Sequence, residues 1–308
     1  MYTNNQPDLS INFAGVILKN PVIAASGSFG YGKEYQGLLD ISNLGGICSK
    51  WLTLNPRTGN TGKRIHETPS GLMNSIGLEN PGIPAFIENE LPAMRKLGPV
   101  IIANLSGFSL EEYQEGARLL DASDIDMIEL NISCPNVKAG GMAFGLDPEA
   151  ATPVVQAVRK AAASKPLIVK LSPNAPDLAS VAKACEKAGA DALSLVNTFK
   201  AMAIDINLRK PVFDNINAGL SGPAIRPIAL RMVWELWETV KIPIVGIGGI
   251  AFVHDALEFL LAGASAIQVG SATFANHPAM NEIISGIAEY MVLKGYKKID
   301  NLAIRREK

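Results

Sequence analysis

Polar residues and glycines recur where short apolar runs of the chain end. Lys50 and Lys170 each end a run that is otherwise apolar, and a buried ammonium there needs an anionic or polar partner. One such lysine could be paired with a carboxylate, whereas two at matching positions indicate an anionic or electron-rich ligand. In chain order the run ends carry Ser26, Lys50, Asn104, Asn131 followed by Cys134, Lys170, Asn197 with Thr198, Gly248 with Gly249, and Gly270 with Ser271.

Cys134 is the residue with the greatest chemical reactivity in this set. It lies in NISCPN, at the start of a glycine-rich segment, beside Asn131, Ser133 and Asn136. A lone cysteine is often only a small buried hydrophobic residue. Polar neighbours are not needed for that role, and a thiol near a cation or hydrogen-bond donors can act as a general base. The pattern therefore favours Cys134 as a base, whereas Cys48 and Cys185 are interpreted as packing residues.

Glycines follow the last two apolar runs, in GIGGI and VGSA. Backbone N–H groups approach a phosphate closely where glycine leaves room, and barrel enzymes commonly place a phosphate after strands 7 and 8. A tight turn without a ligand is the alternative. GIGGIA also matches a dinucleotide-binding pattern, but no acidic residue stands about 20 residues later, so we reject a dinucleotide site.

The elements that must position these residues are buried parallel strands. Continuous apolar runs cover 21–26, 45–51, 99–105, 127–133, 166–172, 192–198, 243–249 and 266–272. Runs of this kind are typical of strands buried on both faces. Helical segments lie between most of them, and Ser109 with Glu112 predicts the start of one. Eight such units predict a closed (β/α)8 TIM barrel, with an open doubly wound sheet as the alternative.

Two long segments interrupt the alternation. Residues 52–82 and 134–148 are rich in Gly, Pro and Asn, and both follow a predicted strand end. Loops of this length inside a compact domain are usually lids or binding loops. Because no repeat, charge run or linker separates parts of the chain, we predict a single domain over 1–308.

Composition excludes several classes of protein. Of the 308 residues, 48% are hydrophobic, and the net charge is 28 − 29 = −1, so neither a disordered chain nor a nucleic-acid partner is expected. Three cysteines form no disulfide framework and are too few for an iron–sulfur cluster, and the three histidines lack the spacing of metal ligands. Neither a signal peptide nor an 18-residue apolar stretch is found, so we expect a soluble cytoplasmic protein without a metal or membrane contact.

The motifs together resemble the class 1 dihydroorotate dehydrogenases from about residue 10 to 280. The matching segments are ASGSFGYGKE, GLMNSIGLENPG, ELNISCPNVKAGGMAFG, VKLSPN, VNT, NAGLSGPAIRP, GIGGI and QVGSATF. NVKAGGMAFG and LSGPAIRPIALRM resemble the NAD-linked 1B catalytic subunit rather than the fumarate-linked 1A form. The resemblance implies an FMN-binding (β/α)8 barrel that oxidises dihydroorotate to orotate in pyrimidine biosynthesis.

The resemblance also implies roles for individual residues. Cys134 matches the catalytic base. Trp51 stands where a small residue is usual, so its side chain is expected to point away from the flavin, and Ser271 keeps the hydroxyl of the common threonine. The FMN-contacting positions are matched by Ser26, Lys50, Trp51, Asn104, Asn131, Lys170, Val196, Gly222, Gly248, Gly249, Gly270 and Ser271. The substrate-contacting positions are matched by Lys50, Asn74, Ser75, Ile76, Gly77, Leu78, Asn131, Asn197 and Thr198.

Electrons must leave the barrel if this is the 1B form. The resemblance implies a second subunit that carries FAD and an iron–sulfur cluster, in a heterotetramer with two copies of each chain, and NAD⁺ as the final acceptor. The fumarate-dependent 1A form stays open as an alternative. A non-redox phosphate-binding barrel enzyme and a catalytically silent assembly subunit also stay open, although Cys134 and Lys50 argue against the silent subunit.

Overall fold

The chain folds around a closed barrel of parallel strands. The computed structural model describes residues 7–132, 144–299 and 302–303. Around the barrel the strands follow the chain order, and the last pairs with the first. They are β3 (Val22–Ala24), β4 (Gly46–Cys48), β7 (Val100–Leu105), β8 (Met127–Asn131), β9 (Leu167–Lys170), β10 (Ala192–Leu195), β15 (Ile244–Ile247) and β16 (Ala266–Val269). Each strand lies within one of the eight apolar runs, so the predicted (β/α)8 barrel is confirmed and the open sheet is excluded.

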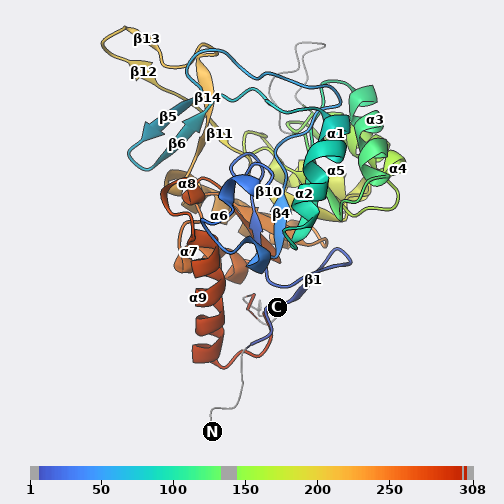
Figure 1. Cartoon of the computed structure of the whole chain (residues 1–308), viewed down its shortest axis with the longest axis vertical. Helices are drawn as coiled ribbons and strands as arrows, with labels where there is room; N and C mark the ends of the chain where they lie inside the picture. Colours follow the sequence, from blue (N-terminus) through green and yellow to red (C-terminus); the bar gives the residue numbers. More distant parts are fainter. Residues whose placement is uncertain (1–6, 133–143, 300–301, 304–308) are drawn as a thin grey trace.

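Helices surround the barrel between successive strands (Figure 1). The longer ones are α3 (Leu110–Asp121), α4 (Pro148–Ala161), α5 (Leu178–Lys187), α6 (Arg226–Thr239), α7 (Val253–Leu261) and α9 (Ala279–Lys294), and α1 (Ile83–Ala85), α2 (Leu91–Arg95) and α8 (Ala272–Ala275) are short. Ser109 caps α3 as predicted, because its side chain accepts a hydrogen bond from the Glu112 N–H at 3.2 Å. No described helix combines the length and apolarity needed to cross a membrane.

A second, smaller sheet lies over one end of the barrel, opposite the hairpin of β1 (Ile11–Phe13) and β2 (Val16–Leu18) (Figure 1). Its strand order is β11-β14-β6-β5. The strands are β5 (Ile65–Thr68), β6 (Gly71–Asn74), β11 (Phe199–Met202) and β14 (Asn217–Ser221), and β12 (Ile204–Asp205) and β13 (Lys210–Pro211) extend from it as a hairpin. Its core contains Met73, Phe213 and Ala218.

This sheet corrects the prediction that 52–82 is only a loop. β6 gains its second neighbour from β14, which lies more than 140 residues later in the chain. The four-residue strands β5 and β6 carry too short a pattern to be recognised locally. The pairing with a distant segment stabilises them, and it is not visible in the sequence around them.

The barrel interior contains a polar group as well as an apolar core. Asn104, Glu129, Lys170, Ser194 and Gln268 are at most 4% exposed and come from five different strands. Buried polar side chains of this kind require hydrogen-bond partners. The strands therefore position a defined polar network inside the barrel.

Candidate active site

A cavity of about 890 Å³, open to solvent, lies between the C-terminal ends of the barrel strands and the small sheet. The strand ends contribute Ser26, Lys170 and Asn197, and the sheet contributes Leu72 and Asn74. This is the end of a barrel at which enzymes of this fold place their active sites.

Most predicted flavin-contacting residues line this cavity. Those that do are Ser26, Trp51, Lys170, Val196, Gly222, Gly248, Gly249, Gly270 and Ser271. Lys50, Asn104 and Asn131 do not line it in this structure, and Asn104 and Asn131 are buried beneath the strand ends. The two asparagines still contact the lining, because Asn104 Nδ2 lies 3.3 Å from Ser26 Oγ and Asn197 Nδ2 lies 3.4 Å from Asn131 Oδ1.

The glycines at one side of the cavity have backbone conformations that explain their residue type. Gly249 has φ +71°, and a Cβ there would lie 2.7 Å from the carbonyl oxygen of Gly222 and 2.8 Å from Arg226 Cβ. Gly222 has φ +96°, and a Cβ there would lie 2.8 Å from Gly71 Cα. Gly270 is different, since its nearest neighbours would be 3.6 Å away. Gly249 and Gly222 therefore bring three backbone segments close together beside the cavity, which a side chain at either position would prevent.

Lys170 is paired with a carboxylate that the sequence prediction missed. Its Nζ lies 3.2 Å from Glu129 Oε1 and 3.1 Å from Ser26 Oγ. Burial by itself would raise the pKa of Glu129, but Lys170 and hydrogen bonds from Gln268, Ser194 and Asn104 hold it below its usual value. A carboxylate in the apolar run MIELN was the available signal, because a buried charge requires partners.

Lys50 also faces a carboxylate. Its Nζ lies 3.8 Å from Glu79 Oε2, which accepts a hydrogen bond from Arg64 at 2.6 Å. The Arg64 hydrogen bond and the Lys50 charge lower the pKa of Glu79. The carboxylate pairing considered for one lysine is therefore present for both, although Lys170 also lines the cavity.

The Trp51 side chain packs against a glycine beside the cavity. Its indole lies against Gly27, since a Cβ on that glycine would be 2.7 Å from Trp51 Cζ2. Both residues line the cavity, and the orientation of the Trp51 side chain relative to a flavin stays a prediction. The absence of a side chain on Gly27, at φ +82°, is what makes room for the indole.

The predicted substrate-contacting residues are only partly brought together. Asn74, Ile76, Asn197 and Thr198 line the cavity. Ser75 instead accepts hydrogen bonds from Asn60 and Asn215 at 3.0 and 3.3 Å. Lys50, Ser75, Gly77, Leu78 and Asn131 do not line the cavity in this structure.

The three cysteines have different outcomes. Cys134, the predicted base, lies outside the described residues. Cys185 is buried on α5, as its interpretation as a packing residue predicted. Cys48 is buried too, but its Sγ lies 3.3 Å from Glu129 Oε1, so it belongs to the polar network rather than to apolar packing alone. Burial and the charge of Glu129 raise the pKa of the Cys48 thiol.

A group of possible metal ligands occurs away from the cavity, on α7. It consists of His254, Asp255 and Glu258. The Arg226 guanidinium pairs with Asp255 and lies 3.5 Å from Glu258, so a cation is already present there.

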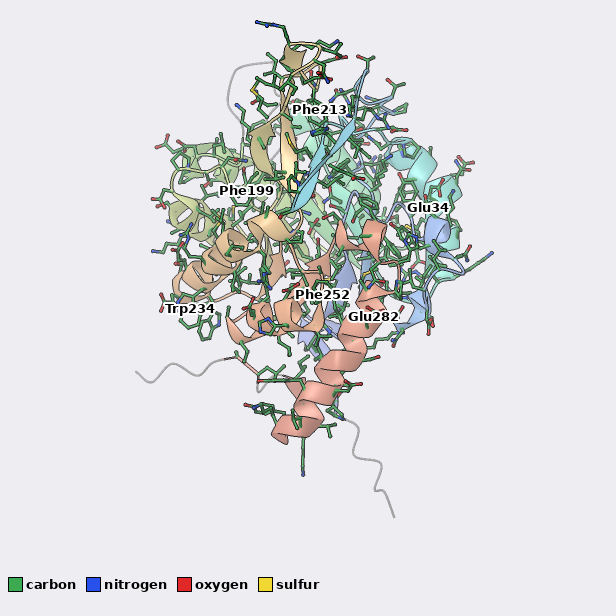
Figure 2. All side chains as sticks on the ribbon, turned by 90° about the vertical axis from the view of Figure 1, so that its left-hand side faces the viewer. Glu34, Phe199, Phe213, Trp234, Phe252 and Glu282 are labelled. Carbon is green, nitrogen blue, oxygen red and sulfur yellow. The ribbon has the colours of Figure 1, made fainter. Side chains whose placement is uncertain are left out.

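Trp234, on the outer side of α6 (Figure 2), packs against Trp237, with ring centroids 5.9 Å apart.

Comparison with known proteins identifies the family of the chain. The family model described as dihydroorotate dehydrogenase matches residues 8–291. The chain is 57% identical over 295 residues to a protein of Petrotoga mobilis, covering 96% of this chain and 98% of that one. A protein of Caldicellulosiruptor saccharolyticus is 54% identical with the same coverage. Both relatives are named the catalytic subunit of dihydroorotate dehydrogenase B (NAD(+)).

Proposed function

Because the chain belongs to the dihydroorotate dehydrogenase family, we propose that it oxidises dihydroorotate to orotate with FMN bound in the cavity. The observation that carries this proposal is the convergence of Lys170, polar groups and a glycine cradle at the C-terminal end of the barrel. The relatives are enzymes of the NAD⁺-linked type, which favours that type over the fumarate-linked form.

The residues around the cavity fit FMN. Gly248 and Gly249, with Gly270 and Ser271, would hold the phosphate through backbone N–H groups and a hydroxyl. Ile225 and Ile250 add apolar surface to the lining of the cavity. The ammonium of Lys170 would stabilise negative charge on the reduced ring. When bound, FMN supplies a hydride acceptor.

The chain's own residues would supply the proton chemistry and the orientation of the substrate. Cys134 follows β8 by three residues in the sequence, and we assign it the removal of the proton next to a carbonyl. Asn74, Asn197 and Thr198 line the cavity and would bind the carbonyl and N–H groups of a planar ring. The small sheet over the strand ends would limit the access of water to the reacting atoms.

An absorption spectrum tests this proposal. The purified protein should show flavin absorbance near neutral pH, and anaerobic dihydroorotate should bleach it. Free FMN with dihydroorotate is the control and should stay unchanged. A colourless protein that binds inorganic phosphate would contradict the proposal and favour a non-redox barrel enzyme.

We further propose that electrons leave through a second subunit. The relatives are named catalytic subunits, which supports a separate partner. The chain has three cysteines, and an iron–sulfur cluster usually needs four thiolates, so a partner with FAD and such a cluster would complete the path. Two copies of each chain would form the complex.

The isolated chain distinguishes this arrangement from direct transfer to NAD⁺. With dihydroorotate it should reduce artificial acceptors but reduce NAD⁺ poorly, and addition of the partner should restore NAD⁺ reduction and increase the mass in light scattering. Rapid NAD⁺ reduction by the chain alone would contradict the two-subunit proposal. Rapid fumarate reduction would favour the 1A form.

A further inference from the structure

The carboxylate of Glu129 is the centre of the polar network inside the barrel. It is 0% exposed and accepts from five side chains. Oε1 accepts from Asn104 Nδ2 at 2.6 Å, Lys170 Nζ at 3.2 Å and Cys48 Sγ at 3.3 Å. Oε2 accepts from Gln268 Nε2 at 2.7 Å and Ser194 Oγ at 2.9 Å. The five donors come from five strands, so one side chain connects most of the barrel.

An ionised carboxylate can only accept hydrogen bonds, and this fixes the orientation of its neighbours. The amides of Asn104 and Gln268 must present their NH₂ groups to Glu129, which turns their oxygens away. Among the described residues, Asn104 Oδ1 and Gln268 Oε1 are buried acceptors without a hydrogen-bond partner. The network therefore holds each of these two amides in one orientation, although their oxygens are left without hydrogen bonds. Because such unsatisfied oxygens cost free energy, the hydrogen bonds to Glu129 determine how the two amide groups are oriented.

The network reaches the cavity through two residues. Lys170 and Ser26 line the cavity, and Asn104 and Lys170 both donate to Ser26 Oγ, at 3.3 and 3.1 Å. Glu129 is not one of the described residues that line the cavity. Its charge nevertheless lies 3.2 Å from the only nitrogen of the Lys170 side chain. A ligand that faces Lys170 therefore lies next to an ammonium whose positive charge is offset by the carboxylate of Glu129, which does not itself line the cavity.

We propose that Glu129 is a positioning residue of the flavin site, which holds Lys170 and Asn104 in place and balances the lysine charge without touching the ligand. This inference rests on the proposed function, because it concerns the flavin bound in the cavity. The physical basis is that a buried ion pair contributes little net charge, whereas either member alone contributes a full charge in a weakly screened environment.

We expect that removal of the Glu129 charge and removal of the Lys170 charge change the reduction potential of the flavin in opposite directions. Glu129→Gln keeps the shape of the side chain and removes the negative charge, so the potential should move to a more positive value. Lys170→Met removes the positive charge and should move the potential to a more negative value. In Glu129→Gln/Lys170→Met both charges are absent, and the potential should return close to that of the native protein. A purely structural role would not produce shifts of opposite sign that cancel.

The experiment is a reductive titration of the FMN-loaded proteins against a redox dye at one pH. Cys48→Ala is the matched control, since it removes a neutral donor from the same carboxylate oxygen, and its potential should equal the native one. An unchanged potential in Glu129→Gln, or shifts that add in the same direction in the double variant, would overturn the inference. If Glu129→Gln does not fold, Lys170→Met is compared with the double variant. The inference then requires that the double variant has a more positive flavin potential than Lys170→Met, and an equal or more negative one would overturn it.

The native protein separates this test from that of the proposed function. A native protein that binds no FMN, or whose flavin dihydroorotate does not reduce, contradicts the proposed function. A native protein with normal flavin chemistry, together with the absence of the opposite shifts, contradicts the role of Glu129 alone.

Discussion

Replacement of Gly249 by alanine should damage both folding stability and FMN binding. Gly249 has φ +71°, a backbone conformation that costs a residue with a Cβ about 1–2 kcal/mol. The new Cβ would also lie 2.7 Å from the Gly222 carbonyl oxygen and 3.0 Å from the Arg226 backbone nitrogen, both of which are main-chain atoms. Overpacking of this kind adds about 1–3 kcal/mol, so we expect the free energy of unfolding to fall by about 3 kcal/mol.

Gly270→Ala is the matched control. Gly270 also lines the cavity, its φ is not in the left-handed region, and its added Cβ would meet its nearest neighbours at 3.6 Å, which is ordinary van der Waals contact. Its free energy of unfolding should therefore stay within about 0.5 kcal/mol of the native value.

Urea unfolding followed by circular dichroism measures both stabilities, and fluorescence quenching of added FMN measures the dissociation constant. Gly249→Ala should weaken FMN binding at least tenfold, which corresponds to about 1.4 kcal/mol. Equal stability losses in the two variants would refute the steric reasoning. Native FMN affinity in a folded Gly249→Ala protein would refute the assignment of the phosphate to this glycine.

Three further outcomes follow from the site. Cys134→Ser should keep FMN bound but slow flavin reduction by dihydroorotate by about 10²–10⁴-fold in stopped flow, and native rates would remove Cys134 from the mechanism. Lys50→Ala should raise the KM for dihydroorotate and alter the flavin spectrum, whereas Lys170→Ala should mainly alter the spectrum; normal reduction in Lys50→Ala would contradict its dual role. Because the folded state holds the pKa of Glu129 below its usual value, its contribution to stability is complete above about pH 4.3 and is lost as the pH falls through the folded pKa. The difference in unfolding free energy between the native protein and Glu129→Gln should therefore shrink in acid, and a difference that grows would contradict the ionised network.

The barrel could be predicted from the sequence because its determinants are local. Each strand is a continuous apolar run, and a strand buried on both faces requires that composition whatever its neighbours are. The same applies to Ser109, whose capping role depends on a residue three positions away. Lys170 could also be identified, because an ammonium at the end of an apolar run is costly unless it has a partner.

Only the tertiary structure decided which groups become partners. Lys170 pairs with Glu129 from the adjacent strand, and Lys50 faces Glu79 from the segment that forms the small sheet. Cys48 has the same local sequence character as a packing residue, yet it contacts Glu129, which lies 81 residues later. The physical reason is that hydrogen bonds and ion pairs depend on distances of a few ångströms between strands, whereas composition and periodicity describe one strand at a time.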